Sequence, residues 1–470
     1  MSNTADTFDV VVIGSGFAGL AAGIEASEAG ASVVVLEKMK APGGNSVISD
    51  GGIAAAGTAL QEKFGYKDSP ELMYQDMIKA GMGLNHPELA RLVAQRSDEV
   101  FKWSMDHLGV QYMDRVDHFG GHSVHRCYTP EGKTGAAIIK KQVEKLRELE
   151  VEIRLGVSFK SFIFGTDGRV CGVKVREGYK YKDPAAGVDG VINARRAVVL
   201  ATGGFGSDVD FRSRQDPRLG PDLDATNMPS ATAQAMKEAF RSGAAPIHLS
   251  HIQLGPWASP DEKGFGDAPV FADYIAFLYG LVVDPATGRR FINELGDRKI
   301  VSDAILSVGH PCIGIADEAA VQAQGWDISR GLKKGVVRKF DGLRELAQAY
   351  EIPLTELEAT VEKFNAFVRN GNDEEFDKPI LPDAAPVEVP PYYAVRLWPK
   401  VHFTMGGVQI DTEARVLDLD GRPIPGLYAA GEVTGGVHGA CRLGSCAITE
   451  CLVFGRIAGR NAAGKRKVPD

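Results

Sequence analysis

The chain has 470 residues, 44% hydrophobic and 24% charged, a composition typical of a globular protein. Its length exceeds the size at which one hydrophobic core keeps growing, so we expect two domains. The net charge of −8 argues against nucleic acid as a partner, whereas a small anionic substrate is compatible with it because a binding site can be locally basic.

Membrane spans and metal sites are not expected. The sequence has no run of 18 apolar residues. The first strand is predicted from Phe8, which leaves no room for a signal peptide. The six cysteines form no C-x-x-C pair, so neither zinc nor haem is indicated. We therefore expect reduced cysteines and a cytoplasmic protein.

The first predicted elements form a strand–helix–strand unit. Residues 8–13 are continuously apolar, which is typical of a strand buried on both faces of a parallel sheet. A glycine-rich turn, a small-residue helix over 20–28 and a second buried strand over 31–36 follow. Glu37 comes directly after this second strand.

The turn carries the pattern G-x-G-x-x-G, which is typical of dinucleotide binding in this context. Gly14 would make the tight turn, Gly16 would let the backbone approach a pyrophosphate, and Gly19 would let helix and strand pack closely. The helix N-terminus would bind the phosphates, and Glu37 would accept hydrogen bonds from ribose hydroxyls. The motif alone does not separate FAD from NAD.

The residue pattern and composition change twice along the middle of the chain. Helical patterns cover 70–108 and 135–149, alternating segments cover 151–174 with a hairpin turn at 165–168, and a buried strand covers 196–201. Residues 250–392 are richer in aromatics and proline, with an amphipathic helix over 353–370 and a proline-rich linker over 379–391. Glycine-rich strand and helix patterns then return, which indicates one nucleotide domain built from both chain ends.

Three further segments carry a resemblance to a known family. They are Gly43-Gly44-Asn45-Ser46 with Asp50-Gly51-Gly52, Ala201-Thr202-Gly203-Gly204, and Gly426-Leu427-Tyr428-Ala429-Ala430-Gly431-Glu432. In this order, the chain resembles the flavoproteins of fumarate reductase and succinate dehydrogenase, a family that also contains 3-ketosteroid dehydrogenases. The resemblance covers nearly the whole chain. It implies an α/β fold, with a Rossmann-type FAD-binding domain over 1–249 and 393–470 and an inserted α+β capping domain over 250–392.

The resemblance also assigns the FAD site. Gly44, Asn45, Ser46 and Gly52 would lie against the isoalloxazine and pyrophosphate, Glu432 would hold the ribityl chain, and Val157 would meet the adenine through its backbone. The remaining expected FAD contacts are Ser15, Ala18, Lys38, Gly51, Ala201, Thr202, Gly203, Gly431, Ser445, Ala447 and Ile448.

We predict that the FAD is non-covalent. Membrane-bound fumarate reductases attach FAD through a histidine in the first of these segments, where this chain has Ser46-Val47-Ile48-Ser49.

Two family segments would hold the substrate. By the resemblance, His402 and Arg442 grip a substrate carboxylate, which suits a guanidinium because it binds carboxylates through two hydrogen bonds. Arg298 matches the arginine that passes a proton to a substrate carbon while flavin N5 passes a hydride to the neighbouring carbon. Phe119 matches a residue that lines the substrate pocket.

The sequence departs from fumarate reductases at the second carboxylate site. Their histidine in a Q-x-H-P context is absent from Gln253-Leu254-Gly255-Pro256-Trp257. Ala276 stands where the relay arginine would be, and Asp273 is a candidate replacement for the glutamate. Because Trp257, Tyr274, Phe277 and Tyr279 are aromatic, we expect a substrate with one carboxylate and a less polar remainder.

The tyrosines of this chain suggest a substrate that contains a ketone. Ketosteroid dehydrogenases use tyrosines to polarise the substrate ketone and to remove a proton from the carbon beside it. Tyr274 and Tyr112 are the expected catalytic tyrosines and Tyr279 a substrate contact, with Tyr128 a further candidate.

The expected activity is that of an FAD-dependent CH–CH oxidoreductase that desaturates a small oxo-acid resembling 4-oxocyclohexanecarboxylate. Alternatives are a fumarate reductase-like enoate reductase, a 3-ketosteroid dehydrogenase and a non-catalytic electron-relay subunit that binds flavin. A disulfide reductase is disfavoured because the cysteine pair it needs is absent. Since no haem or iron–sulfur motif is present, oxygen, a quinone, a free flavin or another protein would exchange the electrons.

Overall fold

The computed structural model describes residues 6–464, and an eight-stranded sheet built from both ends of this range organises its first lobe. The strand order is β18-β19-β8-β1-β2-β5, and the β6–β7 hairpin joins along β8. The central pairs β19–β8, β8–β1, β1–β2 and β2–β5 are parallel. The strands are β1 (Asp6–Ile13), β2 (Val33–Glu37), β5 (Glu152–Leu155), β6 (Val157–Phe164), β7 (Val170–Glu177), β8 (Val188–Leu200), β18 (Arg415–Leu417) and β19 (Pro423–Ala429).

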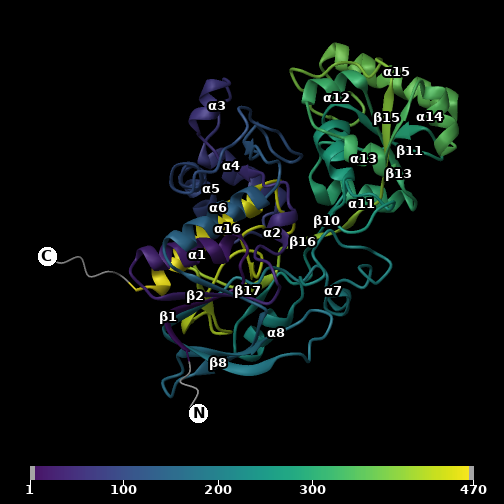
Figure 1. The fold of residues 1–470 in the computed structure, drawn as a ribbon. Coiled ribbons are helices and arrows are strands. Elements are labelled where there is room, and N and C mark those ends of the chain that lie inside the picture. The colour runs from purple at the N-terminus through teal and green to yellow at the C-terminus, as the bar shows by residue number, and fades with distance from the viewer. Residues whose placement is uncertain (1–5, 465–470) are drawn as a thin grey trace.

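Two helices from opposite ends of the chain cover this sheet side by side. They are α1 (Phe17–Glu28) and α16 (Cys446–Ala462), drawn in purple and yellow in Figure 1. A Cβ atom at Gly455 of α16 would lie 2.5 Å from the Ala18 carbonyl oxygen of α1, so glycine allows the close approach. The strand–helix–strand unit predicted from the apolar pattern is therefore present, and its partner helix comes from the far end of the chain.

The rest of the first lobe surrounds this core. Its helices are α2 (Asn45–Ile48), α3 (Ala59–Lys63), α4 (Pro70–Ala80), α5 (Pro87–Lys102), α6 (Ala136–Glu148), α7 (Val209–Gln215) and α8 (Gln234–Arg241), and a π-helical turn (Trp103–His107) extends α5. Its small sheets are formed by β3 (Ile53–Ala54) with β4 (Cys127–Tyr128), and by β9 (Pro246–Ile247), β17 (Gly407–Gln409) and β20 (Thr434–Gly435).

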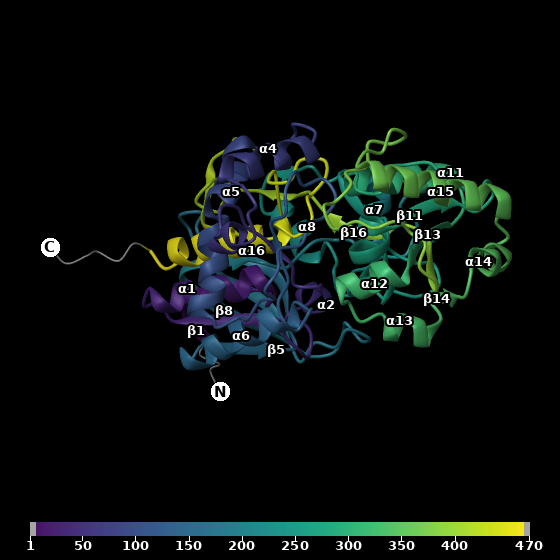
Figure 2. The same ribbon diagram turned by 90° about the horizontal axis from the view of Figure 1, so that it is seen from above.

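The second lobe contains a five-stranded antiparallel sheet in the order β12-β11-β13-β15-β14. Figures 1 and 2 show it in green beside the first lobe. Its strands are β11 (Leu281–Asp284), β12 (Arg289–Arg290), β13 (Cys312–Asp317), β14 (Val337–Phe340) and β15 (Tyr392–Leu397). Its helices are α9 (Ala268–Phe271), α10 (Phe277–Tyr279), α11 (Arg298–Val308), α12 (Glu318–Gln324), α13 (Ser329–Lys334), α14 (Leu343–Tyr350) and α15 (Leu354–Asn370), with a π-helical segment (Ala272–Ala276) between α9 and α10.

The predicted boundary at residue 393 lies too early. Strand β15 pairs with β13 from Cys312↔Leu397 to Asp317↔Tyr392, so it belongs to the sheet of the second lobe. The chain returns to the first lobe after Leu397, through β16 (Lys400–Thr404), which pairs antiparallel with β10 (Ile252–Gly255). The predicted domain ends, residues 1–5 and 465–470, lie outside the described range.

The β10–β16 pair forms the junction between the lobes (Figure 1). Its register skips a residue, because Gln253 lies opposite Phe403 while Leu254 lies opposite Val401. His402 is therefore the extra residue of a β-bulge, a feature that re-aims a side chain. Among residues 6–464, no helix is long and apolar enough to span a membrane.

Candidate active site

A groove runs past the glycine-rich turn between β1 and α1. Gly14 has φ +104°, and a Cβ atom there would overlap the Ala201 carbonyl oxygen, so only glycine fits this turn. A Cβ atom at Gly19 would likewise overlap the Gly14 carbonyl oxygen, which explains why helix and strand pack so closely. The groove then ends at Glu37, whose carboxylate accepts hydrogen bonds from Ser15 Oγ (2.5 Å) and from the Met39 amide (2.8 Å).

This groove has a volume of about 110 Å³ and is lined by most of the expected FAD contacts. They are Gly14, Ser15, Gly16, Ala18, Glu37, Lys38, Gly44, Asn45, Ser46, Ala201, Thr202, Gly203, Gly431 and Glu432. A Cβ atom at Gly44 or Gly203 would meet no atom within 4 Å, so the groove is open where these glycines border it.

A larger cavity of about 320 Å³ continues from the groove. The two share Phe17, Asn45, Ser46, Glu432 and Cys451 in their walls, and the larger cavity adds Gly52, Ser445, Ala447 and Ile448. A narrow glycine-lined groove that opens into a wider chamber fits an elongated cofactor with its pyrophosphate at the helix N-terminus and its ring system in the chamber. The residues present therefore fit FAD.

Three expected FAD contacts lie outside the walls of both cavities. Gly19 supports the turn from behind. Gly51 has φ +81° and packs against Pro130. Val157 begins β6, next to Gly156, whose amide donates to the Met39 carbonyl oxygen near Glu37.

Glu432 is a partly buried carboxyl group at the junction of the two cavities. Its Oε1 accepts hydrogen bonds from the Thr404 amide (3.0 Å) and hydroxyl (3.3 Å). Burial outweighs these bonds and raises the pKa of Glu432 to about 7.

His402 and Arg442 meet in the wall of the larger cavity, as expected for a clamp. Arg442 Nη2 donates to Nε2 of His402 at 3.1 Å, so His402 Nδ1 carries the ring proton and donates to Thr226 Oγ1 at 2.8 Å. Burial and the neighbouring guanidinium groups hold the pKa of His402 well below its usual range, and the ring is neutral.

Arg442 has unused hydrogen-bonding capacity. It is 5% exposed, and no carboxylate among residues 6–464 forms an ion pair with it. Its Nε has no hydrogen-bond partner in the same range. Burial and the nearby Arg298 lower the pKa of Arg442 to about 10, and the group stays cationic at neutral pH. A buried cation without a carboxylate partner favours an anionic ligand.

Arg298 begins α11 and lines the same cavity. Its Nη2 donates to Asp273 Oδ2 at 3.2 Å. Asp273 lies in the π-helical segment, a type of distortion frequent at functional sites. Burial raises the pKa of Asp273 to about 6 despite the adjacent Arg298. Three arginines line the cavity. Arg298 is paired with Asp273 and Arg330 with Asp267, whereas Arg442 has no carboxylate partner among the described residues.

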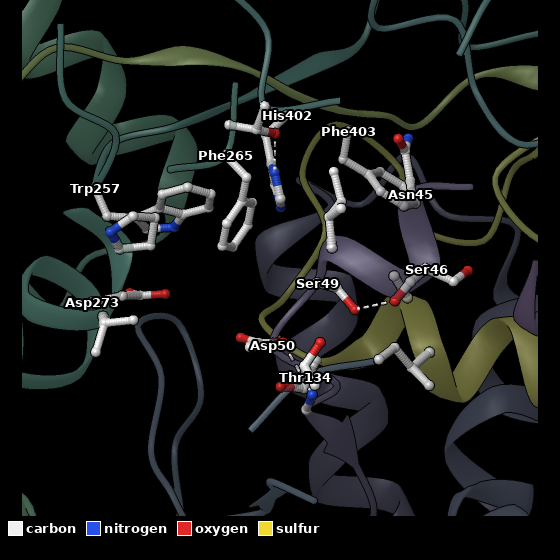
Figure 3. A pocket seen from close by; sticks show the side chains of 18 of the residues that line it. Asn45, Ser46, Ser49, Asp50, Thr134, Trp257, Phe265, Asp273, His402 and Phe403 are labelled. Carbon is white, nitrogen blue, oxygen red and sulfur yellow. Dashed lines mark hydrogen bonds between the residues drawn. The ribbon is translucent and has the colours of Figure 1, made fainter. Parts of the chain in front are cut away.

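Aromatic side chains form much of the remaining wall. Figure 3 shows Trp257, Phe265 and His402 facing Ser49 and Asp50 across the pocket. The Trp257 ring lies 4.8 Å from the His402 ring and 5.6 Å from the Arg298 guanidinium carbon. This part of the wall offers apolar contact surface.

Tyr274 lines the cavity, but its hydroxyl is already engaged. It donates to Asp50 Oδ2 at 2.7 Å, and burial beside Asp50 holds the pKa of Tyr274 well above its usual range. This environment does not support the catalytic role predicted for Tyr274, because the hydroxyl proton is committed to a carboxylate.

The other predicted aromatic residues lie outside the cavity wall. Tyr112 bonds to Ser104 (2.9 Å), Tyr279 donates to Asp383 (3.0 Å), and Phe119 packs behind Tyr274 at 5.1 Å. Their positions do not support direct contact with a substrate. Tyr128, the further candidate, bonds to Thr58 and also lies outside the wall.

Several wall residues were not expected from the sequence, among them Trp326 and Lys133. Trp326, from the loop after α12, lies 3.9 Å from the Tyr274 ring, with the two ring planes tilted by 38°. Lys133, from the loop before α6, lies 4.5 Å from the Trp326 ring. Neither belongs to a recognisable motif, and folding alone brings them together.

The family model described as FAD binding domain matches residues 9–448. The chain is 43% identical over 459 residues to the acrylate reductase flavoprotein subunit of Shewanella woodyi, covering 96% of this chain and 90% of that protein. Among solved structures, an open conformation of a flavocytochrome c3 fumarate reductase is similar, with a TM-score of 0.75, 33% identity and coverage of 98% of this chain and 79% of that chain. A 3-ketosteroid Δ4-(5α)-dehydrogenase from Rhodococcus jostii, with 4-androstene-3,17-dione, has a TM-score of 0.76, 25% identity and coverage of 99% of each chain.

Proposed function

Because this chain belongs to the FAD-binding-domain family of oxidoreductases, we propose that it reduces the carbon–carbon double bond of a small unsaturated monocarboxylate of the acrylate type. The observation that carries this proposal is the pairing, in one cavity, of a free carboxylate clamp at Arg442 and His402 with the Arg298–Asp273 pair.

Arg442 would bind the substrate carboxylate. Its side chain is buried, cationic and without a carboxylate partner among the described residues. Neutral His402 keeps the guanidinium in place through Nε2 and is itself oriented by Thr226. A carboxylate bound there would form charge-assisted hydrogen bonds in a place from which water is largely excluded.

Arg298 would deliver the proton. When bound and reduced, FAD supplies a hydride for the carbon–carbon double bond. Arg298 would give a proton from its Nη to the carbon next to the carboxylate, so that one hydride and one proton add across the bond. Asp273, with a pKa of about 6, is placed to return a proton to Arg298.

The aromatic wall favours one carboxylate over two. A second carboxylate beside Trp257 and Phe265 would lose its hydration without gaining a counter-ion from these rings. The other two arginines of the wall are already paired, Arg298 with Asp273 and Arg330 with Asp267. The similarity to an acrylate reductase subunit points in the same direction, because acrylate has a single carboxylate. The expected oxo-acid resembling 4-oxocyclohexanecarboxylate has no such support, and the engaged Tyr274 hydroxyl argues against ketone polarisation.

The test is reoxidation of the reduced enzyme in the absence of oxygen. Acrylate is expected to restore the oxidised flavin spectrum within seconds in stopped flow. Arg298→Ala should abolish this step while acrylate still binds, and Arg442→Ala should raise the acrylate Kd about a hundredfold, the loss expected for one buried charged hydrogen-bond donor pair. Prompt bleaching of the oxidised enzyme by a saturated keto-acid, with no response to acrylate, would contradict the proposal.

We further propose that the FAD is held non-covalently, because the 46–49 segment offers no histidine for attachment. Acid precipitation is expected to leave the flavin in the supernatant, and yellow protein in the pellet would refute this. Since the sequence has no haem or iron–sulfur motif, the reducing electrons would come from a separate donor.

A further inference from the structure

Trp257 lines the larger cavity and packs against Gly255 of β10. A Cβ atom at Gly255 would lie 3.0 Å from Cη2 and Cζ2 of Trp257 and 3.3 Å from Cε2. The backbone at Gly255 is not in the left-handed region, so the conformation itself does not demand glycine. It is the indole lying on this Cα that leaves no room for a side chain.

The face that Gly255 presents is the one turned toward the clamp. Gln253, two residues earlier on β10, donates from Nε2 to the Arg442 carbonyl oxygen at 2.7 Å. Side chains two apart on a strand point to the same side. A side chain at position 255 would therefore point into the space that the indole now fills.

The indole is fixed from several directions. It is 2% exposed, and Phe265 lies 5.3 Å from it, in addition to the His402 ring at 4.8 Å and the Arg298 guanidinium at 5.6 Å. It therefore occupies the volume next to both the clamp and the proton donor. Any substituent that a clamped substrate carries beyond its double bond has to share that volume.

We propose that Gly255 and Trp257 act as a matched pair that sets substrate specificity, by filling the space beside Arg298 and restricting the enzyme to short enoates with one carboxylate. This inference rests on the proposed function and deepens it. The pair is expected to discriminate against β-substituents by size and, because the indole offers no counter-ion, against a second carboxylate by charge.

The experiment compares acrylate with crotonate, which adds a methyl group, and with fumarate, which adds a carboxylate. Holoenzyme and variants are titrated with each acid and with propionate, butyrate and succinate, and Kd is read from the perturbation of the oxidised flavin spectrum. The kcat/KM values for the three enoates are measured alongside. Flavin content and the unfolding temperature report whether each variant folds.

Trp257→Ala should raise the crotonate-to-acrylate ratio of kcat/KM and lower the crotonate-to-acrylate ratio of Kd, each by about tenfold or more, which is the range for one methyl group in an apolar pocket. Trp257→Phe, which keeps most of the ring volume and folds more readily, should shift the ratio less but in the same direction. Trp398→Ala serves as the control, because Trp398 lies outside this cavity wall. An unchanged ratio in both Trp257 variants would overturn the proposal.

Gly255→Ala tests whether the effect of residue 255 on specificity depends on the Trp257 indole. Its methyl group would push on the indole, so the ratio should change in the wild-type background and not in the Trp257→Ala background. Gly220→Ala is the matched control, because a Cβ atom at Gly220 meets no atom within 4 Å. Equal effects of Gly255→Ala in both backgrounds would contradict the pairing. If the wild-type enzyme reduces none of the enoates, the proposed function fails, and the titrations still decide whether the pair selects among carboxylates.

Discussion

Two conditions act on the pKa of Glu432 in opposite directions: hydrogen bonds from Thr404 lower it, and partial burial in the cavity wall raises it. Its pKa of about 7 in the folded state lies above the ordinary value of 4.5 that the unfolded chain has. The folded state thus keeps the proton over a pH interval in which the unfolded state has lost it. Stability is therefore lost as the pH rises from about 4.5 to about 7, by about 3 kcal/mol in total at roughly 1.4 kcal/mol per pH unit.

Glu432→Gln should remove this loss, because the amide has no charge to bury and can still accept from the Thr404 amide. In urea unfolding of the FAD-free protein, the variant should match the wild type near pH 4.5 and exceed it by about 3 kcal/mol at pH 8. A difference that is the same at both pH values would show that ionisation of Glu432 is not the cause.

Individual residues differ in how far the sequence could predict them. The roles of Gly14 and Glu37 could be predicted from the sequence, because one short strand–helix–strand unit places both residues. The pairing of His402 with Arg442 could be predicted only from the family resemblance, because no local sequence pattern indicates a hydrogen bond between residues 40 positions apart. The place of Trp326 in the cavity wall could not be predicted from the sequence, because tertiary packing alone brings it against Tyr274.

At the scale of elements, the turn between β1 and α1 is the feature most sensitive to a single methyl group. Gly14→Ala would combine an unfavourable φ with overlap on the Ala201 carbonyl oxygen, and the turn has to move. We expect loss of FAD from the purified protein and a destabilisation of about 3 kcal/mol or more, measured by flavin content and by chemical unfolding.

Gly30→Ala is the control for the conformational part of this effect. Gly30 also has a positive φ, +84°, but its Cβ would meet nothing within 4 Å. This variant should lose about 1 kcal/mol and keep its flavin. Similar losses in the two variants would mean that the carbonyl contact at Gly14 is unimportant.

Elements were predicted well where their pattern was local and less well where the pairing partner mattered. The amphipathic pattern over 353–370 corresponds to α15, and the turn at 165–168 joins β6 and β7. Strand β15 was assigned to the wrong lobe, because a mostly buried strand has the same apolar sequence pattern in either sheet. The bulge at His402 had no signature in the sequence, since it depends on the register with β10.

At the scale of the molecule, the two lobes share one hydrophobic core and also meet over the larger cavity. The loop at 324–326 of the second lobe is held by two cations of the first. Arg115 donates to the Gln324 carbonyl oxygen (3.0 Å) and Lys133 to that of Gly325 (3.3 Å), and both cations lie against the Trp326 ring. We name this contact the Trp326 latch.

The Trp326 latch should favour the arrangement of the lobes in which they meet over the larger cavity. Replacing both Arg115 and Lys133 with alanine removes two cation–π contacts, together worth about 1 to 2 kcal/mol, and should weaken acrylate binding about tenfold. Amide hydrogen exchange over 321–336 should become faster at the same time. Lys140→Ala, on the solvent face of α6, is the control. Unchanged exchange in the double variant would show that other contacts hold the lobes together.

The arrangement of the central sheet also governs when the protein can acquire its flavin. Strand β8 lies between β1 and β19, and α16 covers α1, so the groove needs residues from both sides of the chain before it has walls. While a ribosome is still extending the polypeptide, the glycine-rich turn exists without Gly431 and Glu432, and the apolar side of α1 is uncovered. Flavin loading therefore has to wait until Gly431 and Glu432 have been synthesised. Until then the growing chain exposes apolar surface.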